Sequence, residues 1–320
     1  LVTIGVLYNV RPKKGYEKTK ASLKKLQGKS KGGSYGSANF AEEKDVTENE
    51  LWGNVDPKAP YKGLIIGKFR GKFLRFAKPG HLITFAPTRS GKGVGHVIPN
   101  CLDHPGSIVV NDIKGENYSI SHEYRRKFTD VYCFAPFGKE QGIESSSYNP
   151  LDFIRVGTEN EMDDVALIGD MIILEEGKDP FWEREARNLV IALILHVATS
   201  RQPALRNMGE VQFLISQSKR DMEATFKEMV ASKNANVRKM GNAFSATEAK
   251  VLSSIMSVAK SQMAIWNSPL LKAITGKSNF DPADIKRRPI SFYLIIPPEQ
   301  LDPYKPVVRL MVGIIIASMM

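Results

Sequence analysis

The sequence predicts an α/β fold with a parallel sheet, into which an all-helical region is inserted. Between residues 81 and 137, short apolar segments of strand character alternate with segments of helical spacing, the order that gives a parallel sheet with crossover helices. From about 159 to 284 the apolar spacing is helical almost throughout. An apolar strand pattern, PISFYLIIPP, then returns at 289–298. The chain therefore re-enters the sheet after the helical region.

The predicted strands of the α/β part are HLITFAP (81–87), SIVVND (107–112), DVYCFAPF (130–137) and the segment at 289–298. Helices are expected to begin within KGVGHVIPNCLDH, at NYSISHEYRRKF, and from about Tyr304 onward. We place the α/β domain in 36–154 and 286–320, and the all-α domain in 155–285.

The positive charge of the chain is concentrated near its beginning. Of the net charge of +11, residues 1–36 carry +8, from nine Lys or Arg and one Glu. This Lys-, Gly- and Ser-rich composition predicts a basic linker at 1–35, suited to an anionic membrane surface or a nucleic acid. The apolar LVTIGVLYNV before the basic run is typical of the cytoplasmic end of a membrane helix. We therefore expect a membrane anchor before residue 1, and a helix that continues beyond VVRLMVGIIIASMM.

The cysteine and histidine content argues against a structural metal site. The two cysteines, Cys101 and Cys133, form no metal-type pair, and the five histidines show no ligand spacing. Both thiols are expected to be reduced and buried.

The all-α region divides by charge. Residues 155–185 carry a net −7, and residues 186–288 a net +9. These are either solvated helix faces or two surfaces suited to different partners. Six of its aromatic residues could stack on bases, but at helical spacing they are more typical of a core: Phe181, Trp182, Phe213, Phe226, Phe244 and Trp266.

The motif that carries the chemistry is APTRSGKG at 86–93. A phosphate loop presents backbone N–H groups at a helix N-terminus, and a lysine just inside that helix bridges the outer phosphates. Here the motif follows an apolar segment and precedes a helix, which is the expected context. The predicted phosphate-binding residues are Thr88, Arg89, Ser90, Gly91, Lys92, Gly93 and Val94, with Lys92 in the catalytic role.

Two positions depart from the common phosphate-loop pattern. Ala86 replaces the first glycine, and Gly93 replaces the serine or threonine whose hydroxyl normally binds Mg²⁺. Thr88, Ser90 or a water molecule is left to supply that ligand.

A second motif, NDIKGEN at 111–117, places Asp112 at the end of a predicted buried strand. A carboxylate there can hold Mg²⁺ or a water beside the phosphates, or it can cap the next helix. The residues favour neither role. The later strand ISFYLII carries no acidic residue, so phosphate binding is clearer here than cleavage.

Several blocks together resemble the type IV secretion coupling proteins of TraG/TraD type: GSANFA (36–41), APTRSGKGVG (86–95), PGSIVVNDIKGEN (105–117), YNPLD (148–152), FWEREARNL (181–189) and YLIIPPEQL (293–301). They occur in the family's order, and Ala-Pro with glycine after the lysine is common in that family. Lys92 corresponds to the phosphate-loop lysine, and Asp112, Lys114, Gly115 and Glu116 to the second family block.

The resemblance implies a RecA-like motor domain with an all-α insertion, which uses ATP and Mg²⁺ as a hexamer at the cytoplasmic face of the inner membrane. It implies delivery of a relaxase bound to single-stranded DNA, or of effector proteins, to the secretion channel. The family's acidic Asp-Glu pair has no match in this sequence, so hydrolysis is expected only of a longer chain. Candidates for an arginine acting across a subunit boundary are Arg287, Arg288 and Arg309.

Two other functions stay open. One is a nucleotide-dependent substrate receptor without motor activity. The other is a DNA translocase of chromosome-partitioning type, which shares the RecA-like core but needs neither the helical insertion nor the membrane-end pattern. A soluble phosphate-loop kinase or GTPase is disfavoured by the size of the insertion.

Overall fold

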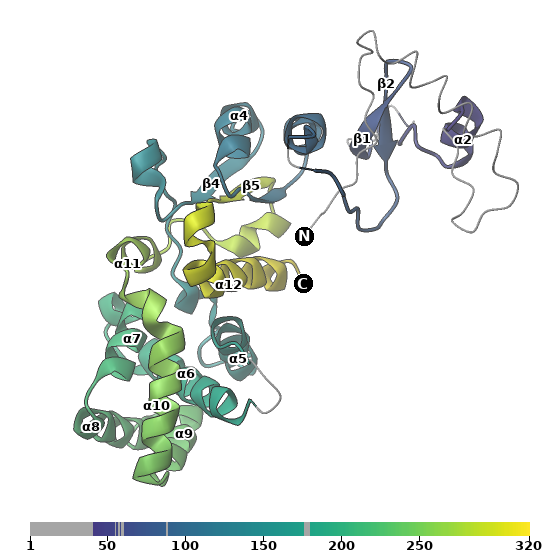
Figure 1. Cartoon of the computed structure of the whole chain (residues 1–320). Coiled ribbons are helices and arrows are strands. Elements are labelled where there is room, and N and C mark those ends of the chain that lie inside the picture. Colours follow the sequence, from purple (N-terminus) through teal and green to yellow (C-terminus); the bar gives the residue numbers. More distant parts are fainter. Residues whose placement is uncertain (1–40, 55, 57, 59–60, 88, 176–179) are drawn as a thin grey trace, which may run out of the picture. The chain divides into compact units, whose positions relative to one another are not determined.

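The computed structural model describes residues 41–54, 56, 58, 61–87, 89–175 and 180–320. Their contacts divide the chain into two compact units (Figure 1). The first unit extends to Gly106 and also takes in Glu123–Arg125. The second comprises Ser107–His122 and Arg126–Met320.

The first unit contains a hairpin that the sequence pattern did not predict. The elements of the first unit are α2 (Glu43–Glu48), β1 (Leu64–Phe69), β2 (Lys72–Phe76), the π-helical turn η1 (Gly93–Val97) and α3 (Ile98–Asp103). Strands β1 and β2 are antiparallel and are joined by Arg70 and Gly71, whose φ angles are 48° and 83°. Positive φ at both turn residues matches the twist of a tight hairpin. The usual Asn-Gly signal is absent because arginine occupies the first position.

The predicted strand at 81–87 is wrong. This segment belongs to neither sheet, and its side chains Ile83 and Phe85 are 59% and 85% exposed. A strand exists only where neighbouring backbone pairs with it, and no strand in the described part of the chain does so. The apolar composition shows a preference for a pleated environment, but it does not supply the partner.

The second unit contains a parallel sheet of the order β3-β5-β4. Its strands are β3 (Ile108–Asn111), β4 (Asp130–Phe134) and β5 (Ile290–Leu294). Strand β5 comes last in the sequence but lies between the other two, and all five of its residues are buried. The predicted return of the chain into the sheet after the helical region is therefore confirmed.

The two faces of this sheet are covered by α4 (Glu116–Arg125) and α12 (Leu301–Met319) (Figure 1). On one face Tyr293 of β5 packs edge-on against Tyr118 of α4, with ring centroids 5.3 Å apart. On the other face Phe292 belongs to the large core that includes Tyr304 of α12. Consecutive residues of β5 thus face opposite layers, as the alternation of a strand requires.

The helical region is built around one central helix, α6, in which Leu189–Val197 are all buried (Figure 1). Its helices are α5 (Glu161–Ile172), α6 (Phe181–Ser200), α7 (Met208–Ser216), α8 (Lys219–Val230), α9 (Ala235–Ser245), α10 (Ala249–Met263) and α11 (Pro269–Thr275). Four of them begin at a side chain that accepts a first-turn N–H: Asn207, Ser218, Asn234 and Ser268.

Short 3₁₀ turns join these elements: Gly138–Gln141, Pro150–Phe153, Pro203–Leu205, Ala264–Asn267, Pro282–Lys286 and Pro298–Gln300. Cys101 and Cys133 are buried free thiols, as predicted. Within the described ranges, no helix has the length and apolar character needed to cross a bilayer, and no cluster of side chains could hold a metal ion.

Candidate functional site

The phosphate-loop motif bends sharply between Pro87 and Gly91. The Ser90 N–H donates to the Pro87 carbonyl at 3.3 Å, and Arg89 and Gly91 have φ angles of 63° and 86°. The left-handed conformation costs a non-glycine residue roughly 1–2 kcal/mol but costs glycine almost nothing. Gly91 is therefore the residue that lets the chain enter the helix. Thr88 lies outside the described residues.

The next backbone N–H groups are available to a ligand. In the part of the chain that the structure describes, the N–H groups of Gly91, Lys92, Gly93 and Val94 have no hydrogen-bond acceptor. They stand at a helix N-terminus, where the aligned peptide dipoles favour negative charge. Four free amides in succession can therefore bind phosphate oxygens.

The side chain of Lys92 spans the loop. Its exposed Nζ donates to the Ala86 carbonyl at 3.3 Å. An ammonium group has three protons, so this bond leaves others for oxygens of a ligand. The lysine is thus held over the loop rather than packed into the protein.

The helix that follows starts with a wide turn because it contains Pro99, which has no backbone N–H. The Gly95 N–H bonds to the Gly91 carbonyl at 2.8 Å, but Pro99 has no N–H to offer the Gly95 carbonyl four residues earlier. The chain therefore forms a π-helical turn over Gly93–Val97, in which hydrogen bonds span five residues instead of four, before α3 begins. The sequence predicted the helix but not the π-turn.

Two buried polar residues lie directly after the loop. Asn100 bonds through its side chain to both backbone groups of Ile65 in β1, at 2.8 Å each, and also donates to the His96 carbonyl. His96 is 1% exposed, and burial lowers its pKa to about 4 because the imidazolium form loses its hydration. Near neutral pH it therefore adds no positive charge to the site.

The hydroxyl that a magnesium ion would need has one described candidate in the loop. The Ser90 Oγ is buried and has no hydrogen-bond partner among the residues that the structure describes. At Gly93, an added Cβ would meet no atom within 4 Å, so the absence of a side chain there is not a steric requirement. Oxygen ligands of this kind are those that Mg²⁺ prefers, so Ser90 fits a magnesium-bound nucleotide.

In the second unit, Asp112 is engaged in the turn that starts α4. Its carboxylate is 2% exposed and accepts hydrogen bonds from the Tyr118 N–H at 2.8 Å and the Asn117 side chain at 3.0 Å. Burial raises its pKa, and these hydrogen bonds oppose that rise. The capping role, one of the two open at the sequence level, is therefore present in the structure.

The rest of this motif surrounds the same turn. Gly115 has a φ of 71° and leads into α4, while Lys114 and Glu116 are exposed. The structure thus gathers residues 89–94 in the first unit and residues 112–116 in the second.

The three candidate arginines all make contacts inside their own chain. Arg287 pairs with Asp284 at 3.0 Å, and Arg288 pairs with Asp284 at 2.7 Å and also with Asp130. Arg309 donates to the Asp170 carbonyl at 3.0 Å. None of these contacts marks one of the three as a group that acts on a neighbouring subunit.

The six aromatic residues of the helical region divide evenly. Phe226, Phe244 and Trp266 are core residues, with at most 7% exposure. The other three, Phe181, Trp182 and Phe213, are 41–60% exposed. Only this second group is placed to touch a partner.

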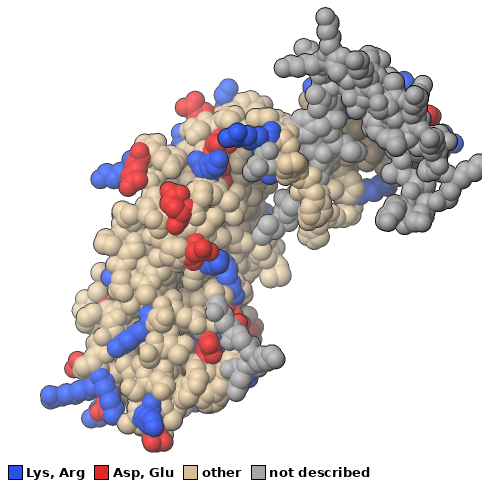
Figure 2. Space-filling model, viewed as in Figure 1, with Lys and Arg blue, Asp and Glu red and all other residues tan. Residues whose placement is uncertain are grey.

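Some acidic side chains of the helical region are already paired with other residues of the chain. Glu161 accepts hydrogen bonds from Asn234 and Asn236, and Asp170 pairs with Arg187 at 2.7 Å. On the face that Figure 2 shows, basic and acidic side chains are interspersed over the second unit. Solvated helix faces therefore describe this surface better than two separate charged surfaces do.

A parallel α/β sheet with a helical insertion after β4, together with a helix N-terminus whose backbone N–H groups and lysine can bind phosphate, is the arrangement typical of α/β phosphate-loop proteins. The chain belongs to the family described as type IV secretory system conjugative DNA transfer, whose model matches residues 29–319. The resemblance to coupling proteins drawn from the sequence blocks is thereby confirmed.

Curated relatives agree with this family. The conjugal transfer protein TraG of Escherichia coli is 30% identical over 312 residues, which cover 88% of this chain and 48% of TraG. The protein VirD4 of Rhizobium radiobacter is 29% identical over 287 residues, which cover 87% of this chain and 40% of VirD4. The chain thus spans about half the length of the curated relatives it matches.

Solved structures agree on the fold. The plasmid coupling protein TrwB in complex with ADP and Mg²⁺ superimposes with a TM-score of 0.52 at 14% identity, over 72% of this chain and 50% of TrwB. TrwB in complex with the ATP analogue ADPNP gives the same score at 13% identity over the same shares. The predicted RecA-like α/β fold is confirmed by these neighbours.

Proposed function

We propose that residues 86–93 bind the phosphates of ATP together with Mg²⁺. The observation that carries the proposal is the run of backbone N–H groups from Gly91 to Val94 that have no acceptor among the described residues, together with the exposed Lys92 ammonium in the same loop. The amides and the helix N-terminus would hold the β-phosphate, Lys92 the outer phosphates, and Ser90 the magnesium ion. TrwB, of similar fold, is known with ADPNP and with ADP and Mg²⁺.

We propose Asp112, Lys114, Gly115 and Glu116 as the second motif of the nucleotide site. Asp112 keeps lone pairs beyond the two that accept from Tyr118 and Asn117. Its carboxylate would bind a water of the magnesium ion while it continues to cap α4.

For the whole protein we propose the role of a type IV secretion coupling protein. In this role, residues 36–154 and 286–320 form the nucleotide-binding domain, 155–285 recognise the substrate, and 1–35 link both to an inner-membrane anchor. The substrates are relaxase-bound single-stranded DNA or effector proteins, the partners are components of the secretion channel, and the assembly is a hexamer. The family match and the relatives TraG and VirD4 support this proposal.

Nucleotide binding is tested by Lys92→Ala in the 320-residue chain. Removing the ammonium group is expected to weaken binding of an ATP analogue with Mg²⁺ at least about a hundredfold, since charge-assisted bonds to phosphate are roughly twice as strong as neutral ones. Lys250→Ala, which removes an exposed lysine of α10, should bind with unchanged affinity. Calorimetry measures both, and equal affinities in the two variants would remove the proposal.

A second experiment separates a motor from a nucleotide-dependent receptor. We expect the full-length protein to hydrolyse ATP, single-stranded DNA to stimulate it, and Lys92→Ala to abolish it. The observation that favours a receptor is that the Asp112 carboxylate is already engaged in capping α4, where it accepts two hydrogen bonds, rather than being free for catalysis. ATP binding without turnover, with DNA, substrate protein and lipid all supplied, would establish the receptor function instead.

A further inference from the structure

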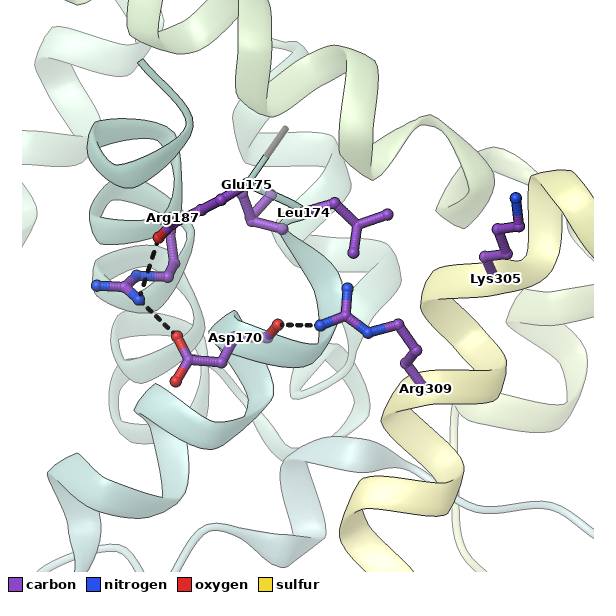
Figure 3. A pocket seen from close by; sticks show the side chains of 7 residues that line it. Asp170, Leu174, Glu175, Arg187, Lys305 and Arg309 are labelled. Atoms are coloured by element: carbon purple, nitrogen blue, oxygen red, sulfur yellow. Dashed lines mark hydrogen bonds and ion pairs between the residues drawn. The ribbon is translucent and has the colours of Figure 1, made fainter. Parts of the chain in front are cut away.

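A cavity of about 550 Å³ lies within the second unit, between the helical region and α12 (Figure 3). It is lined by Asp170, Ile173, Leu174, Glu175, Arg187, Lys305 and Arg309. The first five belong to the end of α5, the segment after it and α6, and the last two to α12. The cavity falls within the size range of small-molecule sites, about 300–1,000 Å³.

The acidic side chains of this cavity are already paired. Asp170 and Glu175 both face Arg187, at 2.7 and 3.7 Å, as the dashed lines of Figure 3 show for these residues. Arg187 is thereby neutralised. The remaining positive charge of the cavity comes from α12.

Arg309 has a different environment. Its guanidinium points toward the end of α5 and donates through Nη2 to the Asp170 carbonyl at 3.0 Å (Figure 3). Among the residues that the structure describes, no carboxylate lies within 4.0 Å of it. A guanidinium stays charged at every physiological pH, so this cation faces the cavity with only a neutral partner.

Two buried N–H groups of the cavity also lack acceptors. The Nη1 of Arg309 and the Nε of Arg187 are inaccessible to solvent and have no hydrogen-bond partner within the described part of the chain. A buried donor without a partner is costly, and more so when it is charged. Such donors beside a cavity indicate a ligand that supplies acceptor oxygens.

We propose that this cavity binds a phosphate group, free or carried on a small molecule. The guanidinium of Arg309 would turn so that Nη1, which is buried and has no acceptor among the described residues, donates to a phosphate oxygen. Lys305, one helical turn earlier on α12, would approach as a second cation. Lys305 already pairs with Asp302 at 2.8 Å, so it contributes less than Arg309. The apolar side chains Ile173 and Leu174 leave room beside the phosphate for a small organic group.

The proposed site lies where α12 meets the helical region. Helix α12 follows the central strand β5, whereas α5 and α6 belong to the helical region. A phosphate bound to Arg309 would connect the two and stabilise their packing. The ligand would therefore act as a tie between the sheet domain and the helical region.

The test uses the chain with Lys92→Ala, so that binding at the phosphate loop does not contribute and the outcome is independent of the proposed ATP site. Inorganic phosphate and AMP are titrated separately and binding is followed by calorimetry and by the side-chain NMR signals of arginine. Adding Arg309→Gln is expected to weaken phosphate binding at least about tenfold. Adding Arg220→Gln, which removes an exposed arginine of α8, should leave it unchanged.

Each arm of the test decides something. Tighter binding of AMP than of phosphate identifies a carried phosphate group, and the reverse identifies the free ion. Equal affinity for phosphate with and without Arg309→Gln overturns the proposal. Citrate is titrated in the same way, and its binding while phosphate does not bind overturns the proposal as well. If Arg309→Gln prevents folding, Lys305→Gln replaces it, with an expected loss of several-fold; an unchanged affinity there likewise overturns the proposal.

Discussion

The side-chain amide of Asn100 forms two hydrogen bonds with the backbone of Ile65, one in each direction and each 2.8 Å long. Asn100 lies in α3, the helix that continues the phosphate loop, and Ile65 lies in β1. The pair therefore fixes the helix whose N-terminus presents the free amides. Because 35 positions separate the two residues, no local sequence pattern indicated this contact.

The first prediction concerns Asn100→Ala. It leaves the buried N–H and carbonyl of Ile65 without partners, and each such group costs about 1–3 kcal/mol. We expect the free energy of unfolding to fall by about 2–4 kcal/mol and nucleotide affinity to fall with it. Urea unfolding and calorimetry measure the two effects. Asn242→Ala, which removes an exposed asparagine of α9, should change neither quantity. Equal behaviour of the two variants would show that the hydrogen bonds between Asn100 and Ile65 do not position the loop.

Most of the second unit could be predicted from sequence. The strands β3, β4 and β5 are apolar, short and bounded by turns, and the helices between them show the period expected of amphipathic segments. Their pairing order was not predictable, because the central strand β5 comes from the far side of a long insertion. Local periodicity carries no information about which strand lies in the middle.

The candidate site was predictable only in part. Its residues follow from the Gly91-Lys92 pattern, but three features depend on distant or backbone effects. These are the hydrogen bond from Lys92 to Ala86, the π-turn that Pro99 imposes, and the neutral state of buried His96. The strand at 81–87 failed because composition indicates preference and not pairing.

The second prediction concerns Gly93→Ser, which restores the hydroxyl of the common phosphate-loop pattern. An added Cβ meets no atom within 4 Å, and serine suits a helix better than glycine by roughly 0.5 kcal/mol. We expect unchanged or slightly higher stability and a several-fold gain in ADP affinity that depends on Mg²⁺. Titrations with Mg²⁺ and with EDTA show the difference. Gly93→Ala adds the carbon without the hydroxyl, so the same gain in that variant would rule out a new metal ligand.

The third prediction concerns Gly241→Ala in the helical region. Its Cβ would lie 2.7 Å from the Met229 Cβ and 2.9 Å from the Val230 nitrogen, neither of which can rotate away. Overpacking of this kind costs about 1–3 kcal/mol, which exceeds the roughly 1 kcal/mol that alanine gains over glycine within a helix. We expect lower stability from the separation of α8 and α9, measured by thermal unfolding. Gly93→Ala, where the space is open, should not destabilise the chain, and a stable Gly241→Ala would show that the two helices can move apart without loss.

The fourth prediction concerns the pH dependence of stability through His96. Its pKa is about 4 in the folded chain, below the ordinary value of 6.5. Between these values the unfolded chain binds a proton that the folded chain does not, so stability falls as the pH drops from about 6.5 toward 4 and is unaffected above that range. The full difference amounts to about 3 kcal/mol.

Replacement of His96 isolates this contribution. His96→Leu removes the titrating group from its buried position, so the fall in stability between pH 6.5 and 4 should become shallower by about 3 kcal/mol, as measured by urea unfolding at several pH values. His104 and His196, whose pKa values burial also lowers, remain and leave a smaller slope of the same sign. An unchanged slope in His96→Leu would mean that this ring titrates with the same pKa in the folded and the unfolded chain. The helix after the phosphate loop would then gain a positive charge below about pH 6.5, and nucleotide affinity would rise as the pH falls through that value instead of staying constant.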